Sequence, residues 1–103
     1  MTSDPEPSDE LLRAKLNLET ARISWQELQR FFAMGSTLSV SSDLDLVEVG
    51  VCFARDDAAI VENWLKAGTV APVSDELARH WLEKDADLWC LVVRPWVLVQ
   101  DKV

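Results

Sequence analysis

The residues best suited to nucleophilic or metal chemistry are one histidine, His80, and two cysteines, Cys52 and Cys90. A Ser/His/Asp or Cys/His catalytic group needs a hydroxyl or thiol beside the histidine, and no GxSxG or comparable motif marks one. The cysteines lie in apolar segments without CxxC spacing, which is typical of buried thiols in a reducing compartment. None of the three has the spacing of zinc ligands. We therefore expect no metal or cofactor, and we retain His80 as a candidate base or surface binding residue.

A pair of carboxylates, Asp45 and Glu48, is a second candidate for chemistry. The two are three positions apart, so on a helix they share one face. With Asp43 they could act in acid-base catalysis or hold a hard cation. The alternative is a solvated helix face on which acidic residues near the N-terminus interact favourably with the helix dipole. Asp45 and Glu48 remain candidate binding residues under either interpretation.

Two tryptophans, Trp89 and Trp96, flank Arg94 and Pro95 near the end of the chain. A tryptophan beside a proline in this region can reach the surface and contact a protein or a ligand. Stacking on nucleic-acid bases is the less favoured use, because such sites also need a positive groove. We predict a binding surface that includes Trp89, Arg94 and Trp96.

The charge of the chain limits its partners. The formal net charge is -8, and the sequence has no basic stripe. Contacts to phosphates need clustered lysine and arginine, so we expect neither nucleic acid nor an anionic membrane surface as a partner. The three glycines form neither GxGxxG nor a P-loop, so we expect no nucleotide site. A protein partner or a second copy of the chain remains.

The length of 103 residues predicts one domain. Residues 1–8 (MTSDPEPS) are acidic, contain two prolines and have almost no apolar side chain, which predicts a disordered tail before a globular domain at 9–103. The apolar stretch 88–99 is interrupted by Arg94 and Pro95 and is shorter than the roughly 20 residues of a membrane span. No signal-like segment is present, so we expect a cytoplasmic protein.

Capping and periodicity predict most of the elements. Ser8 precedes an apolar helical pattern over 9–21. Ser24 begins a second helical pattern, which ends at Gly35. Further helices are expected around 60–65 and at 75–84, the second capped by Ser74. Strands are expected at 36–40 and in the apolar run 88–93, which is typical of a strand covered on both faces. Residues 96–100 form either a bent continuation of that run or a separate edge strand.

The segment 43–54 is ambiguous between strand and helix, and a weak internal repeat decides it. An offset of 33 residues sets Gly35 on Gly68 and Ser41 on Ser74. Each copy then has the order helix, glycine, short strand, serine cap, helix. By analogy with Ser74, Ser41 is predicted to cap a helix at 43–54. The fold class is therefore α+β or small α/β, with a three- to four-stranded sheet and four to five helices.

Two segments carry a resemblance to a known family, LDLVEVGVCFARDD at 44–57 and VVRPWVLVQ at 92–100. With them, the chain resembles a family of small bacterial proteins catalogued as domain of unknown function 2288. The resemblance implies a bacterial cytoplasmic protein and transfers no functional residue. The acidic N-terminal segment lies outside it.

These observations favour a non-enzymatic binding or protein-interaction module, with self-association as one form of interaction. The absence of a catalytic motif and the apolar C-terminal strand region support this hypothesis. The alternative is a small enzyme that uses Asp45, Glu48 or His80 in acid-base chemistry.

Overall fold

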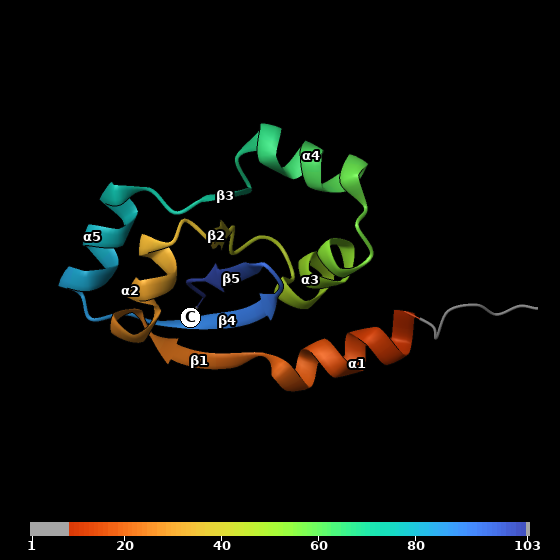
Figure 1. Cartoon of the computed structure of the whole chain (residues 1–103), viewed down its shortest axis with the longest axis horizontal. Coiled ribbons are helices and arrows are strands. Elements are labelled where there is room, and N and C mark those ends of the chain that lie inside the picture. Colours follow the sequence, from red (N-terminus) through yellow and green to blue (C-terminus); the bar gives the residue numbers. More distant parts are fainter. Residues whose placement is uncertain (1–8, 103) are drawn as a thin grey trace, which may run out of the picture.

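The computed structural model describes residues 9–102, and the expected acidic tail at 1–8 lies outside this range. The helices are α1 (Asp9–Glu19), α2 (Trp25–Ala33), α3 (Leu46–Ala54), α4 (Ala58–Ala67) and α5 (Asp75–Glu83). The strands are β1 (Ala21–Ser24), β2 (Thr37–Val40), β3 (Val70–Pro72), β4 (Asp87–Val93) and β5 (Trp96–Gln100). Within the described range they form an α+β fold in which helices lie on both faces of one sheet (Figure 1).

The five strands form a mixed sheet in the order β1-β4-β5-β2-β3. β4 and β5 are joined by a tight turn and pair antiparallel, with Leu91 opposite Leu98. β5 runs parallel to β2, and the edge strands β1 and β3 are antiparallel to their neighbours. Because helices cover both faces, the alternating side chains of β4 and β5 are apolar in both directions. The predicted central strand at 88–93 is confirmed.

The segment 96–100 is a separate strand, but its expected place at the sheet edge is wrong. β5 lies at the centre of the sheet, between β4 and β2. Pro95 lies in the turn before β5, so the missing N–H of proline removes no ladder hydrogen bond. Residues 97–100 are all buried, and a central position supplies the neighbours that bury them.

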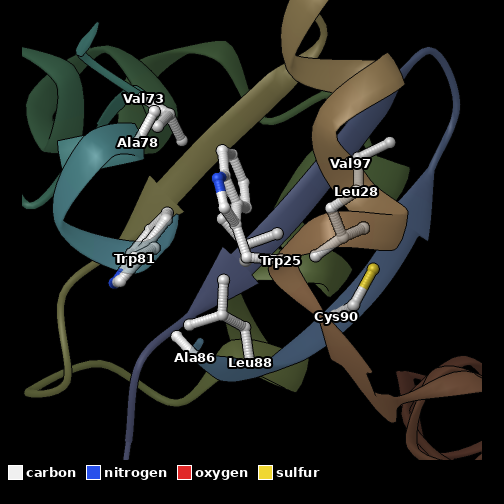
Figure 2. Close-up of a cluster of buried hydrophobic side chains, with 10 residues drawn as sticks. Trp25, Leu28, Val73, Ala78, Trp81, Ala86, Leu88, Cys90 and Val97 are labelled. Atoms are coloured by element: carbon white, nitrogen blue, oxygen red, sulfur yellow. The ribbon is translucent and has the colours of Figure 1, made fainter. Parts of the chain in front are cut away.

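One face of the sheet is covered by α2 and α5. Figure 2 shows Trp25 and Leu28 of α2 and Trp81 of α5 projecting over the strands, where Leu88 lies beneath them. The rings of Trp25 and Trp81 meet edge to face with centroids 5.1 Å apart, a geometry that aromatic pairs prefer. Both tryptophans are buried core residues.

The other face is covered by α1, α3 and α4. Leu16 of α1 and Val49 of α3 are buried against Leu91 and Leu98 of the central strands. Trp64 of α4 packs at the margin of this cluster and is only partly buried. Trp64 therefore contributes to the core only in part.

The edge strand β1 was not predicted, and the sheet has five strands where three or four were expected. The helix expected over 9–21 ends at Glu19, and Ala21–Ser24 pairs with β4, with Ile23 opposite Leu88. The four residues ARIS have little local preference for a strand. Their conformation is set by the hydrogen-bonding edge of β4, which is distant in the sequence.

The predicted helix at 43–54 exists as α3, but its predicted start is wrong. Asp45 caps α3, because its carboxylate accepts hydrogen bonds from the backbone N–H groups of Val47 at 2.9 Å and Glu48 at 3.4 Å. The Ser41 hydroxyl accepts from the Asp43 N–H at 3.2 Å inside the preceding turn. Ser74 is the cap of α5 as predicted, with its hydroxyl 3.0 Å from the Leu77 nitrogen.

The internal repeat holds for the order of elements and not for their arrangement. Both copies run helix, glycine, strand, helix, and Gly35 and Gly68 both adopt the left-handed conformation that ends a helix. The first helix of copy one, α2, lies on one face of the sheet, whereas the first helix of copy two, α4, lies on the other. Corresponding helices of the two copies therefore cover opposite faces of the sheet.

Candidate functional site

A cleft of about 520 Å³ opens between α4 and the turn that joins β4 to β5. Its volume is within the range of small-ligand and side-chain pockets. The end of α3, the α3–α4 connection and the first residue of β5 complete its walls. It lies on the face of the sheet that carries α3 and α4.

The α3–α4 connection places carboxylates at the rim of this cleft. Asp56 has a positive φ of 59°, a left-handed conformation that aspartate and asparagine tolerate better than most residues. Asp57 follows as the N-cap of α4, and its carboxylate lies 3.5 Å from the Ile60 nitrogen. A sharp turn of two acidic residues therefore orients α4 and lines the cleft.

The floor of the cleft is apolar. Trp96, at the start of β5, is partly buried and lines the cleft. Leu65 of α4 also lines the cleft and is 44% exposed. Phe53 of α3 also lines the cleft.

The charges around the cleft are unequal. Asp56, Asp57 and Glu62 contribute carboxylates, and Arg94 is the cation in the lining. This excess of negative charge favours a ligand that carries positive charge and an apolar surface together. Because Arg94 lies at the β4–β5 turn, it can also donate hydrogen bonds to a carbonyl or carboxylate of the same ligand.

Of the residues predicted to form a site, the fold brings Arg94 and Trp96 together in this cleft. Trp89 is not part of the lining. It lies farther along β4, opposite Arg22 of β1, whose guanidinium carbon is 5.1 Å from the centre of the tryptophan ring. That geometry is a cation–π contact, so Trp89 connects the edge strand to the centre of the sheet.

Asp45 and Glu48 lie together with Arg13 in a separate depression between α1 and α3. Glu48 forms an ion pair with Arg13, and this hydrogen bond raises the pKa of the guanidinium. Asp45 is engaged as the cap of α3. Both carboxylates therefore have structural partners, and the Glu48–Arg13 ion pair joins α3 to α1 on one face of the sheet.

His80 is exposed on α5, which lies on the other face of the sheet from α3 and α4. It lines neither the cleft at the β4–β5 turn nor the depression between α1 and α3, and the carboxylate on which its charge acts is that of Asp101. Burial raises the pKa of the Cys90 thiol to about 11 and also raises the pKa of Cys52, which keeps both thiols protonated at neutral pH. Within the described part of the chain, no group of three or more His, Cys, Asp or Glu side chains could hold a metal ion.

The acidic rim and the exposed Leu65 were not predicted as parts of a site. Asp56 and Asp57 lie between the end of α3 and the start of α4. A usable signal was the apolar stripe of α4, which includes Ile60, Val61, Trp64 and Leu65. None of these side chains is fully buried in the folded chain, so part of the stripe is accessible to a partner.

The fold and the cleft define a small α+β protein with an open cleft whose rim is acidic. The chain belongs to the family described as "Protein of unknown function (DUF2288)", which matches residues 11–101. This result confirms the resemblance seen in the sequence. Nothing in the family description indicates a specific activity.

A solved structure is similar over nearly the whole chain. It is the solution NMR structure of PA1075 from Pseudomonas aeruginosa, 46% identical, with a TM-score of 0.78 over 97% of this chain and 93% of that chain. A search of curated proteins found no match. In the described residues no helix is long and apolar enough to cross a membrane.

Proposed function

We propose that this protein is a non-enzymatic interaction module whose cleft at the β4–β5 turn binds a basic segment of a partner protein. The observation that carries the proposal is the combination of an apolar floor, formed by Trp96 and Leu65, with a rim of carboxylates. Lysine and arginine have apolar stems and charged ends, so they match such a surface in both respects.

The arrangement of the cleft favours a polypeptide segment. The stem of a bound lysine or arginine lies along Trp96 and Leu65, and its charged group reaches Asp56 or Glu62 at the rim. Arg94 on the opposite side donates to a backbone carbonyl of the bound segment. Enclosed pockets suit small molecules, whereas a cleft open to solvent leaves a path for the chain on either side of the bound side chain.

The net charge of -8 supports a basic partner in a second way. A strongly acidic surface attracts a cationic partner at long range and raises the rate of association, and salt weakens this effect. The two free cysteines, Cys52 and Cys90, fit a cytoplasmic location, where thiols remain reduced.

The test is a titration of the isotopically labelled protein, followed by NMR, with a capped peptide of alternating lysine and leucine that contains one tryptophan. We expect saturable shifts concentrated at residues 53–65 and 94–96. The same peptide with glutamate in place of lysine serves as the first control and should not bind. No saturable binding, or shifts of equal size over all acidic surfaces, would contradict the proposal.

Variants make the test site-specific. Asp56→Asn combined with Glu62→Gln removes two rim charges, and asparagine retains a tolerance for the left-handed conformation at position 56. We expect affinity for the basic peptide to fall about tenfold or more. The matched control is Asp75→Asn with Glu76→Gln, which removes two acidic charges from α5, outside the cleft. An equal loss with the control pair would show that only net charge matters.

A further inference from the structure

A second apolar groove, of about 530 Å³, lies on the face of the sheet covered by α2 and α5. Its floor includes Val92 of β4 and Val97 of β5, and its walls include Phe31 of α2 and Ile23 of β1. Val92 is 47% exposed although it belongs to a central strand. The two helices thus leave the turn end of β4 uncovered on this face.

The side of α2 next to this groove continues the apolar surface. Glu27, Arg30, Phe31 and Met34 follow the spacing of one helix face, and Met34 is 74% exposed. The Arg30 guanidinium lies over the Phe31 ring, with its carbon 4.9 Å from the ring centre. The groove therefore has an exposed apolar strip with one acidic and one basic side chain at its border.

An apolar strip bordered by Glu27 and Arg30 is complementary to a second copy of itself. Two copies related by a two-fold axis present the same patch to each other, so each residue must find its complement on an identical surface. If two α2 helices pack antiparallel around an axis between positions 27 and 30, Glu27 of each copy faces Arg30 of the other. Phe31 and Met34 follow on the same side of α2, so apolar side chains lie next to both ion pairs.

The charge distribution of the rest of the chain also favours this face for self-association. Two copies that each carry a net charge of -8 repel each other over most orientations. The border of this groove is balanced, because Glu27 is matched by Arg30. Contact there brings together the apolar surface of both copies at little electrostatic cost.

We infer that a second copy of this chain occupies the groove, forming a two-fold dimer through α2, Val92 and the end of β1. The surface is separate from the acidic cleft, which lies on the other face of the sheet. The dimer therefore leaves the cleft open, and the two proposals stand on different residues.

Sedimentation equilibrium of the full chain from about 10 µM to about 1 mM tests the dimer, since weak homodimers dissociate in this range. We expect the wild type to move from the monomer mass toward twice that mass, and Val92→Glu to raise the dissociation constant at least about tenfold. Circular dichroism verifies that each variant is folded. A wild type that stays monomeric over the whole range would overturn the inference.

Charge exchange gives the sharpest result. Glu27→Arg alone and Arg30→Glu alone each place like charges across the two-fold axis, so both should weaken the dimer. The double variant restores opposite charges and should recover a large part of the affinity. The control is Leu18→Lys, which removes the most exposed leucine of α1 outside the groove and should leave the mass unchanged. Failure of the double variant to recover, or loss of the dimer with Leu18→Lys, would overturn the inference.

Discussion

At the scale of single residues, Asp101 connects the chain after β5 to α5. Its carboxylate accepts hydrogen bonds from Lys84 Nζ at 2.8 Å and from Trp81 Nε1 at 3.2 Å. The hydrogen bond from Lys84 lowers the pKa of Asp101, and the one from Trp81 contributes in the same direction. The indole N–H of the buried Trp81 therefore has a partner, which a buried donor requires.

This geometry predicts a pH dependence of stability. The pKa of Asp101 is lower in the folded protein than in the unfolded chain, so the unfolded chain binds more protons near the ordinary aspartate pKa of about 3.9. The stabilisation is present above that pH and is lost as the pH falls through the lower, folded-state pKa. We expect Asp101→Asn to lower the free energy of unfolding at pH 7. This loss relative to the wild type should become smaller as the pH falls, and urea unfolding at several pH values measures it. The control is Asp43→Asn, which removes the carboxylate of an exposed aspartate in the same way. If the wild type and Asp101→Asn differ in free energy of unfolding as much at about pH 2 as at pH 7, the ionic explanation is wrong.

At the scale of elements, the start of α3 depends on Asp45. Its carboxylate is the cap of the helix, whereas the Ser41 hydroxyl bonds only within the preceding turn. We therefore expect Asp45→Ala to lower the free energy of unfolding by about 1 kcal/mol. Ser74→Ala removes the cap of α5 and should have a similar effect. Ser41→Ala should cost clearly less, and chemical denaturation of the three variants measures the order. An equal cost for Ser41→Ala would mean that the turn contributes as much as a cap.

The packing of α3 on the sheet depends on Gly50. A Cβ at this position would lie 2.6 Å from Leu91 Cδ2 and 3.3 Å from Leu16 Cδ1, and both leucines are buried. In an exposed helix, glycine to alanine stabilises by up to about 1 kcal/mol, but here the added methyl overpacks the core. We expect Gly50→Ala to destabilise by about 1 to 3 kcal/mol.

A double-mutant cycle separates this packing effect from helix propensity. Leu91→Ala removes the atom nearest to the added methyl, so Gly50→Ala should cost less in that background than in the wild type. Thermal and urea unfolding measure both differences. Stabilisation by Gly50→Ala in the wild type would show that α3 lies farther from β4 than described.

At the scale of the whole molecule, several features followed from the sequence alone because they depend on neighbouring residues. Caps and stops are local, so Ser24, Ser74, Gly35 and Gly68 marked helix ends correctly. The apolar run 88–93 lacks a polar face, which is possible only between two covered faces, so its central position was also predictable. Family membership followed from two short segments in the same way. The candidate site was predictable in part, through Arg94 and Trp96.

Other features were decided by contacts between residues far apart in the chain. The segment 21–24 becomes a strand because β4 offers it a hydrogen-bonding edge, and residues 96–100 become central because β2 runs parallel to them on the far side. Trp89 lies outside the cleft because it pairs with Arg22 and Gln100, away from the β4–β5 turn. Asp45 caps α3, and Glu48 forms an ion pair with Arg13 of α1. The rim formed by Asp56 and Glu62 faces Arg94 only once α4 is placed beside the β4–β5 turn. Periodicity shows which side of an element is apolar, but pairing and packing decide which element that side meets, and both candidate surfaces depend on that choice.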